Sequence, residues 1–307
     1  MSFFDQDFIS KTQNVLYDSQ RDICLDIKRE DEIHPVVSGN KFRKLKYNLK
    51  HVQDTNQSTV LTYGGAYSNH IVATATASKI CGLKSIGVIR GEELFKKTNK
   101  NPTLKYAQQQ GMQLYFISRN DYAKKDTTVE IQKLKKQFGE FYRIPEGGTN
   151  SLAVKGCEEI LTEDDSKYNF IACCVGTGGT LAGIINSSAV NQKIYGFSAL
   201  KNHQHEEIKQ WTDQTNWQIF QEKTFGGYAK TNENLVAFIN DFYDQTSIKL
   251  DPIYTGKLFY NLFDLIKNNH FPNRSKILAI HTGGIQGVEG FNSIQQTKNK
   301  TCINFKL

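Results

Sequence analysis

The chain has 307 residues, of which 38% are hydrophobic and 22% charged, and its 38 basic and 31 acidic residues give a net charge of +7. This composition excludes an intrinsically disordered chain and predicts roughly two folded domains. Acidic residues interrupt the basic ones throughout, so we expect a solvated basic face and no nucleic-acid partner. No apolar run approaches the roughly 18 residues of a membrane span, and the N-terminus is acidic where a signal peptide is basic.

Cysteine usage bears on the compartment and on metal binding. The six cysteines are irregularly spaced, form no Cys-x-x-Cys pair and lie mostly in apolar runs; they are Cys24, Cys81, Cys157, Cys173, Cys174 and Cys302. This pattern is typical of reduced, buried thiols. We therefore expect a cytoplasmic protein without a zinc site.

Short apolar runs alternate with helix-like segments along the chain. The patterns predict strands at 22–30, 60–63, 85–89, 113–117, 170–175, 193–198 and 277–280. They predict helices from residue 41, at 68–81, 102–110, 121–138 and 152–161, from residue 181, and at 233–243 and 256–267. Strand–helix units in succession predict an α/β fold with a parallel sheet. The segment 201–224 is polar and irregular and contains no recognisable motif.

The segment 38–49 is unusual because a lysine stands at the start of an apparent helix. A small polar opening, Ser38-Gly39-Asn40, precedes Lys41. Serine or asparagine caps such a helix, and glycine allows a sharp turn before it. Cations are disfavoured at this end of the helix dipole, which indicates a role for Lys41 beyond that of a solvated charge. Alone, the position also fits an ordinary surface lysine.

Several predicted strands end in glycine-containing loops, at 64–70, 147–151, 176–180 and 281–287. Ligands bind at the carboxyl ends of parallel strands, so we expect these loops to converge. The most informative loop consists of Gly176, Thr177, Gly178, Gly179 and Thr180. Its free N–H groups, hydroxyls and helix end suit a phosphate dianion, although a plain tight turn also fits. It lacks the dinucleotide and Walker signatures, which favours a small phosphorylated cofactor.

A phosphate-binding loop, a lysine at a helix start and the Ser68-Asn69-His70 helix opening together indicate pyridoxal 5'-phosphate. The segment 38–45 resembles the Gly-Gly-Asn-Lys-x-Arg-Lys-Leu segment of 1-aminocyclopropane-1-carboxylate (ACC) deaminases and D-cysteine desulfhydrases. Those are pyridoxal-phosphate enzymes of the tryptophan-synthase-β fold. Further segments similar to that family, in the same order along the chain, are 27–31, 64–70, 176–180, 252–257 and 281–284.

The resemblance implies two open, twisted, parallel-sheet domains with helices on both faces and the cofactor between them. The larger domain would comprise residues 1–51 and 148–307, with a smaller α/β domain, 52–147, inserted. Closure of the smaller domain through the loop around Asn69 would exclude water. The resemblance also suggests a homodimer.

The resemblance also assigns roles to residues. Lys41 would form the Schiff base with the cofactor and then move the α-proton, with Lys44 as the rival lysine. Asn69 would hydrogen-bond the cofactor's O3′ and contact the substrate. Ser68 and His70 would hold the substrate carboxylate, and the loop 176–180 would bind the phosphate.

Two tyrosines and two threonines would complete the site. Tyr254 and Tyr228 would line the substrate side and steer or relay protons, unless they serve only core packing. Thr255 and Thr282 replace a glutamate and a leucine of ACC deaminases and match desulfhydrases. A carboxylate beside the ring nitrogen favours its protonated form, whereas a threonine hydroxyl suits an unprotonated nitrogen. The weaker electron sink that results fits elimination of a good leaving group such as thiolate.

We therefore expect a small amino-acid substrate, with D-cysteine converted to pyruvate, sulfide and ammonia. ACC deamination to 2-oxobutanoate and ammonia is the alternative reaction, and another small D-amino acid also fits. A non-catalytic binder of the cofactor or another phosphate ligand is disfavoured, because it needs neither Lys41 nor Asn69 nor Tyr254. Ser38 and Tyr67 depart from the family pattern, and Tyr67 leaves the shape of the substrate pocket open.

Overall fold

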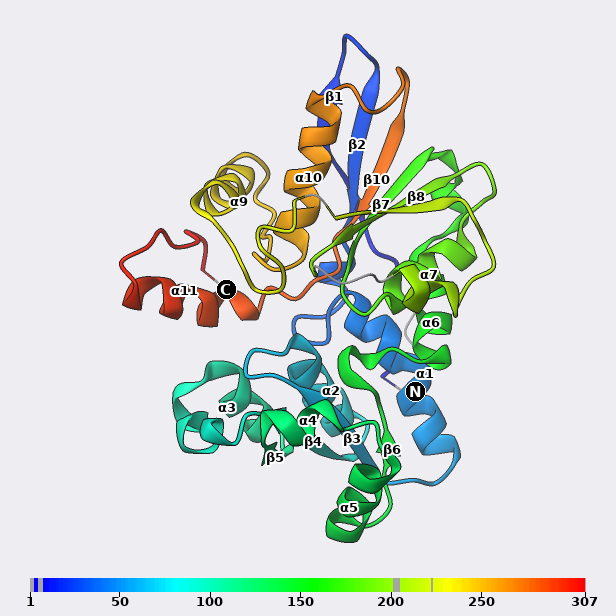
Figure 1. Cartoon of the computed structure of the whole chain (residues 1–307). Coiled ribbons are helices and arrows are strands. Elements are labelled where there is room, and N and C mark those ends of the chain that lie inside the picture. The colour runs from blue at the N-terminus through cyan, green and yellow to red at the C-terminus, as the bar shows by residue number, and fades with distance from the viewer. Residues whose placement is uncertain (1–2, 5–7, 201–204, 222, 307) are drawn as a thin grey trace.

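The computed structural model describes residues 3–4, 8–200, 205–221 and 223–306 (Figure 1). The strands of the larger sheet are β1 (Thr12–Asp18), β2 (Ile23–Lys28), β7 (Phe170–Val175), β8 (Lys193–Ser198), β9 (Trp217–Phe220) and β10 (Lys276–Ile280). Those of the smaller sheet are β3 (Thr59–Gly64), β4 (Lys84–Arg90), β5 (Gln113–Ile117) and β6 (Tyr142–Arg143). The strand orders are β1-β2-β10-β7-β8-β9 and β5-β4-β3-β6.

Parallel pairing dominates both sheets, and within the described ranges only the β1–β2 pair is antiparallel. The central strand β7 is buried along its whole length. Such continuous apolar strands are expected where helices cover both faces of a parallel sheet. The sequence-based prediction of an α/β fold with two parallel-type sheets is confirmed.

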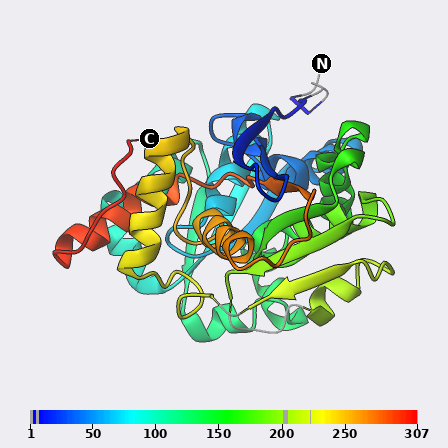
Figure 2. The same cartoon turned by 90° about the horizontal axis from the view of Figure 1, so that it is seen from above.

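Eleven α-helices occupy the described residues. They are α1 (Asn40–Asp54), α2 (Asn69–Ile80), α3 (Pro102–Gln109), α4 (Arg119–Ala123), α5 (Thr128–Phe138), α6 (Ser151–Cys157), α7 (Gly179–Ser187), α8 (His205–Lys209), α9 (Glu233–Thr246), α10 (Thr255–Lys267) and α11 (Gly287–Thr297). Figures 1 and 2 show the larger sheet with α9 and α10 on one side and α7 on the other. The smaller sheet lies below it in Figure 1, beside α1 and α2.

The strand β7 shows how alternate side chains divide between two cores. Phe170, Ala172 and Cys174 pack with residues of α9 and α10. The intervening Ile171, Cys173 and Val175 pack with residues of α6 and α7. Because successive strand side chains point to opposite faces, the larger sheet carries helices on both faces.

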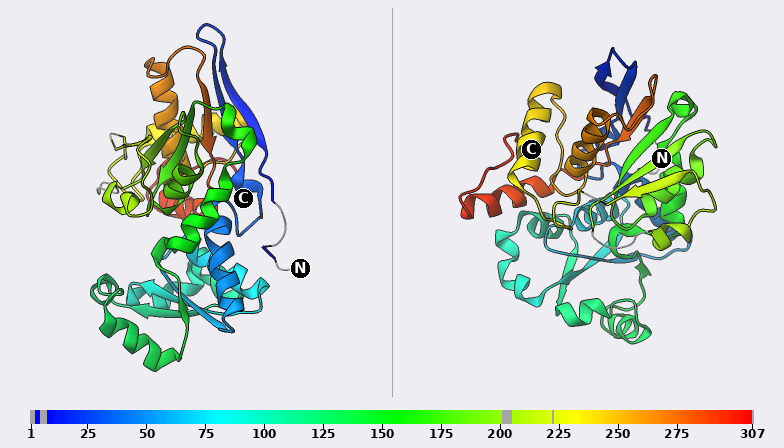
Figure 3. Two further views of the ribbon diagram at one scale, coloured as in Figure 1. Left: turned by 90° about the vertical axis from the view of Figure 1, so that its right-hand side faces the viewer. Right: turned by 45° about the horizontal axis from the view of Figure 1, so that its top comes forward.

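The smaller sheet is also covered on both faces. On one face Leu61 and Tyr63 pack with Tyr122 of α4 and Leu134 of α5. On the other, Val60 shares a core with residues of α1 and α2. The left view in Figure 3 shows the larger sheet above the smaller one, with α1 (blue) between them.

The structure corrects several predicted elements. The single helix predicted at 121–138 is two helices, because Thr127 accepts a hydrogen bond from the N–H of Glu130 and starts a new one. The helix predicted at 152–161 becomes a 3-10 turn after Cys157. The segment 201–224 contains α8 and β9, apart from residues 201–204 and 222, which lie outside the described residues. The strands β1 and β9 are edge strands with mostly unburied side chains, so their apolar patterns are weak.

Across the described ranges, no helix is both long and apolar enough to cross a membrane. The same residues contain no group of three or more histidine, cysteine, aspartate or glutamate side chains arranged to hold a metal ion.

Candidate active site

The loops that follow β3, β7 and β10 meet at the N-terminal end of α1. The backbone N–H of Asn40 donates to the carbonyl of Thr282 at 3.2 Å, and its side-chain amide donates to the hydroxyl of Thr180 at 2.9 Å. The side-chain amide of Asn69 donates to the carbonyl of Gly284 at 2.9 Å. Loops of both sheets therefore converge, as the sequence predicted.

Lys41 lies in the first turn of α1, next to a backbone that only glycine permits. Gly39 has a φ of 58°, and a Cβ there would lie 2.0 Å from the carbonyl oxygen of Thr282. Gly39 is also the N-cap of α1 and makes no side-chain hydrogen bond, so the predicted Ser or Asn cap is wrong. The Lys41 ammonium donates to the side-chain oxygen of Asn40 at 3.0 Å. Burial lowers the pKa of Lys41, which favours the neutral amine needed for attack on an aldehyde.

Lys44 lies one turn further along α1, with its side chain buried. Its ammonium donates to the carbonyl of Gly147 at 3.0 Å, the hydroxyl of Thr149 at 2.9 Å and that of Thr177 at 3.3 Å. All three acceptors are neutral. Burial, with a smaller contribution from the charge of Lys41, lowers the pKa of Lys44 to about 7. A buried cation held by neutral oxygens is a site that favours an anion.

The loop 176–180 supplies the other half of this site. Gly178 has a φ of 81° and is the N-cap of α7, with no side-chain hydrogen bond to the first turn. A Cβ on Gly179 would lie 2.7 Å from the Thr149 methyl group, and the hydroxyls of Thr149 and Thr177 are 2.6 Å apart. The first-turn N–H groups, two hydroxyls and the Lys44 ammonium fit a phosphate dianion.

From the sequence, Lys44 was predicted only as a rival of Lys41 for the Schiff base. The signal that Lys44 also belongs to the site was its three-residue spacing from Lys41, because residues three apart share one helix face. In the structure Lys44 contacts Thr177 of the 176–180 loop, and Lys41 lies one turn nearer the N-terminus of α1.

Ser68 and Asn69 begin α2 at the end of β3. Ser68 is the N-cap, and its hydroxyl oxygen accepts from the N–H of Ile71 at 3.3 Å. The hydroxyl proton of Ser68 is thus left to donate to a ligand, beside the positive end of α2. Asn69 lies close to Gly284: a Cβ added to Gly284 would be 2.7 Å from the side-chain amide nitrogen of Asn69.

His70 is placed differently from its neighbours. It is buried, and its Nε2 lies 2.8 Å from the hydroxyl of Thr62, which itself donates to the carbonyl of Ile144. Nε2 therefore carries the proton, and Nδ1 has no partner among the described residues. Burial, with Lys41 and Lys44 nearby, holds the pKa of His70 well below its ordinary value. The neutral ring offers an acceptor beside Gly148, which does not suit a substrate carboxylate.

Tyr254 and Tyr228 lie together beside the glycine loop. A Cβ on Gly176 would lie 3.1 Å from the Tyr254 ring, and the two tyrosine rings are 6.2 Å apart in an edge-on arrangement. Burial, and then the neighbouring phenol, raises the pKa of Tyr254 well above its ordinary value. Tyr228 keeps 48% of its surface exposed, so a role in core packing does not account for it.

Thr255 and Thr282 differ in what their hydroxyls contact. The Thr255 hydroxyl donates to the carboxylate of Asp251 at 2.7 Å and accepts from the backbone N–H of Asp251 at 2.8 Å. The Thr282 hydroxyl lies 3.1 Å from the sulfur of Cys174. Of the two threonines, Thr282 is the one whose hydroxyl is not tied to a carboxylate.

Sequence reasoning missed Asp251. Its carboxylate is buried and accepts from the backbone N–H groups of Ile253, Tyr254 and Thr255 at 2.8–3.0 Å. It thereby fixes the turn that presents Tyr254. The sequence did contain a signal for this role: Asp251 precedes Pro252 in a predicted loop, and aspartate commonly hydrogen-bonds the backbone of such turns.

Comparison with known proteins agrees with this geometry. The family described as "Pyridoxal-phosphate dependent enzyme" matches residues 18–283, and the chain belongs to that family. It is a pyridoxal-phosphate-dependent enzyme of the tryptophan-synthase-β fold, and its cofactor is pyridoxal 5'-phosphate. The lysine pair and the glycine loop described above fit this group.

Individual relatives narrow the family. An Arabidopsis thaliana protein named bifunctional D-cysteine desulfhydrase/1-aminocyclopropane-1-carboxylate deaminase, mitochondrial, is 31% identical over 292 residues, covering 85% of this chain and 72% of that protein. A Thermotoga maritima protein, provisionally named 1-aminocyclopropane-1-carboxylate deaminase, is 32% identical over 285 residues, covering 85% and 89%. The crystal structure of an ACC deaminase homologue superposes with a TM-score of 0.79 at 26% identity, covering 95% of each chain.

Proposed function

We propose that this enzyme removes the amino group of a small amino acid by α,β-elimination, with D-cysteine as substrate and pyruvate, sulfide and ammonia as products. The observation that carries the proposal is that Lys41 and Lys44, one turn apart on α1, have different surroundings. One amine is available for a Schiff base, and the other is held beside the glycine loop that opens α7.

Each residue has a distinct task in this proposal. When bound, the cofactor supplies an electron sink for the α-carbanion. Lys41 holds the cofactor and then takes up the α-proton of the substrate. Lys44 and the 176–180 loop would bind the phosphate and so hold the cofactor within reach of Lys41.

The substrate side uses the other loops. The hydroxyl of Ser68 and the N-terminal N–H groups of α2 bind the substrate carboxylate. Asn69 orients the ring through its O3′. The Tyr254 phenol, kept protonated by burial, would donate a hydrogen bond to the departing sulfur at neutral pH.

ACC deamination is the second candidate, and the relatives favour it as strongly as D-cysteine elimination. The Arabidopsis protein is named for both reactions and the Thermotoga protein for ACC deamination alone. In support of D-cysteine, the chain has threonine rather than glutamate at position 255. The position of Thr282, whose hydroxyl is available to an unprotonated ring nitrogen, points the same way.

The test is keto-acid release from D-cysteine, L-cysteine and ACC, measured side by side with the purified enzyme and its Lys41→Ala variant. Pyruvate and sulfide from D-cysteine alone, absent with the variant, would support the proposal. Release of 2-oxobutanoate from ACC would replace it with the second candidate. No turnover of any of them, despite a bound cofactor, would remove the D-cysteine assignment.

We further propose that residues 52–147 act as an inserted domain that closes over the site, that the enzyme is cytoplasmic, and that it is a homodimer. The smaller sheet, which lies wholly within residues 52–147, supports the first point. Six free cysteines support a reducing compartment. Light scattering of the purified protein tests the homodimer.

A further inference from the structure

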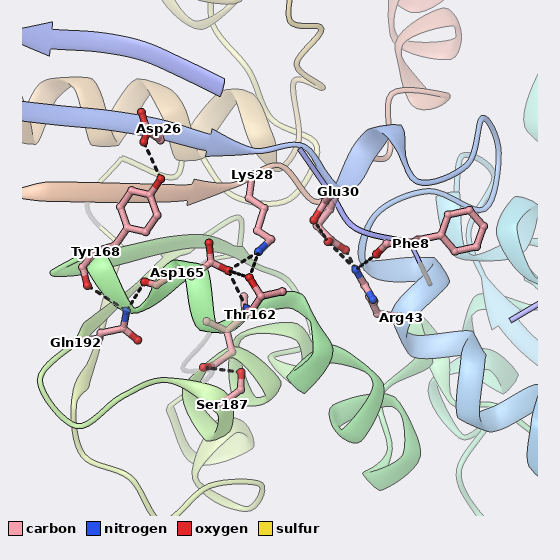
Figure 4. Close-up of polar contacts among 12 residues, drawn as sticks. Phe8, Asp26, Lys28, Glu30, Arg43, Thr162, Asp165, Tyr168, Ser187 and Gln192 are labelled. Carbon is pink, nitrogen blue, oxygen red and sulfur yellow. Dashed lines mark hydrogen bonds and ion pairs between the residues drawn. The ribbon is translucent and has the colours of Figure 1, made fainter. Parts of the chain in front are cut away.

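Two buried ion pairs lie close together at the end of β2 (Figure 4). Lys28 pairs with Asp165, and each of these side chains is 4% exposed. Glu30, two residues further, pairs with Arg43, and these side chains are 0% and 7% exposed. Only the second pair includes a residue of α1, the helix that carries Lys41.

Glu30 holds the first turn of α1 at two points. Its carbonyl oxygen accepts from the backbone N–H of Gly39 at 2.9 Å. Its two carboxylate oxygens accept from Nε and Nη2 of Arg43, each at 2.9 Å. Residues 39 and 43 lie on either side of Lys41, and the helix has no side-chain cap of its own. Glu30 therefore provides the fixation that a capping side chain gives other helices.

The Arg43 end of this arrangement is rigid. Arg43 also donates to the carbonyl of Phe8 at 3.2 Å, and Ser10 donates to the Glu30 carboxylate at 2.6 Å. A Cβ on Gly156 would lie 2.0 Å from the Arg43 carbonyl oxygen, so α6 packs directly against α1 here. A bidentate guanidinium–carboxylate pair fixes orientation as well as distance.

We infer that Glu30 and Arg43 are positioning residues for Lys41: their ion pair sets the rotation of the first turn of α1 and so directs the Lys41 amine into the site. The inference rests on the proposed role of Lys41 as the lysine that binds the cofactor. Among the described residues the Lys41 side chain donates only to its neighbour Asn40, a contact that does not fix the helix.

The Lys28–Asp165 pair is a matched control. It is similarly buried, and Lys28 lies only two residues before Glu30, but its further hydrogen bonds go to Thr162 and, through the Asp165 carbonyl, to Gln192. Asp165→Asn leaves the Lys28 ammonium facing a neutral amide, and Glu30→Gln leaves the Arg43 guanidinium with the more distant carboxylate of Glu159, at 3.6 Å. Both variants should therefore melt at a lower temperature than the wild type. Only Glu30→Gln is expected to alter Lys41.

The experiment uses the full chain with pyridoxal phosphate. The Schiff base is reduced with borohydride across a pH series, and the labelled lysine is identified by peptide mass. Burial holds the pKa of Lys41 below its ordinary value. A rotated first turn exposes the amine, so Glu30→Gln should move the midpoint of Lys41 labelling upward by about one pH unit or more. Asp165→Asn should leave the midpoint at the wild-type value.

A midpoint that is unchanged in Glu30→Gln, or that moves equally in both variants, overturns the inference. If Glu30→Gln does not fold, Glu30→Asp replaces it: this variant keeps the charge but shortens the reach to Arg43. It should shift the midpoint in the same direction at a melting temperature closer to that of the wild type, and no shift overturns the inference. Label on Lys44 in the wild type would instead refute the proposed role of Lys41.

Discussion

The cofactor side and the substrate side of the site are built differently. On the cofactor side, Lys44 donates to three oxygens from two loops, and Gly39 leaves no room for a side chain against Thr282. On the substrate side, Tyr228 and Tyr67 keep 48% and 36% of their surfaces exposed. The first half is fixed by contacts that restrict the ligand it can hold, whereas the second leaves side chains free to adjust to the substrate.

The largest effect is expected from substituting Lys41, the residue proposed to bind the cofactor covalently. Lys41→Ala removes the amine that we propose holds the cofactor and moves the α-proton. We expect the rate of keto-acid release to fall on the order of 10³-fold or more. The control is Lys50→Ala, an exposed lysine on the same helix, which should leave the rate unchanged. Comparable rates for Lys41→Ala and the wild type would contradict the assignment.

The next effect separates affinity from stability at the phosphate loop. Lys44→Met removes a charge-assisted contact, so we expect cofactor affinity, measured by titration, to fall about 10-fold to 100-fold. The same substitution removes a buried cation without a counter-charge, so the cofactor-free protein should unfold at a higher denaturant concentration. Weaker binding together with a less stable cofactor-free protein would mean that Lys44 serves mainly as a structural residue.

The pH dependence of the cofactor-free protein sharpens the same point. The pKa of Lys44 is about 7 in the folded chain, and an unfolded lysine has its ordinary, higher value of about 10.4. Between these values the unfolded chain binds more protons, so stability rises with pH, by up to about 1.4 kcal/mol per unit. Below about pH 7 Lys44 is protonated in both states, so it no longer makes the stability change with pH.

Sulfate, a dianion at every pH in this range, provides the matched measurement. It should stabilise the wild type most near pH 7 and thereby flatten the pH dependence. Lys44→Met should show a smaller slope without sulfate, with the remainder due to Lys41, whose pKa is lowered in the same direction. Identical slopes in the two proteins, measured by denaturant unfolding, would contradict the role given to Lys44.

The smallest effect concerns the substrate side. Tyr228→Phe removes the hydroxyl of a half-exposed tyrosine beside Tyr254, and we expect kcat/KM for the substrate to fall only several-fold, about 1 kcal/mol. In Tyr254→Phe the value of kcat/KM should fall further, because the buried phenol is the proposed hydrogen-bond donor to the leaving sulfur. A larger loss from Tyr228→Phe would reverse the roles given to the two tyrosines.

What the sequence predicted follows the same division. Continuous apolar strands such as β7 and glycine loops with strict backbone requirements are visible in the residues themselves. The pairing of Lys44 with Thr149 and Thr177 depends on three segments far apart in the chain, so no local pattern contained it. The tautomer of His70 is likewise set at long range, by Thr62, whose own hydroxyl donates to the carbonyl of Ile144, 82 residues further along the chain. Asp251 differs, because it engages Thr255 only four residues away and its position before Pro252 was a local signal.

Tyr67 shows most clearly what the sequence alone could not predict. The sequence marked Tyr67 as a departure from the family pattern without indicating its neighbour. In the fold its ring lies against Gly290 of α11, where a Cβ would be 2.5 Å away. The predicted elements did not include α11, so the sequence could not indicate this contact.

The most direct test of this account is to reduce the holoenzyme with borohydride and to identify the modified residue by peptide mass. The account predicts pyridoxyl label on Lys41, with Lys44 unmodified because its ammonium is bound at the phosphate loop. Label on Lys44, or bound cofactor with no reducible bond to any lysine, would contradict it.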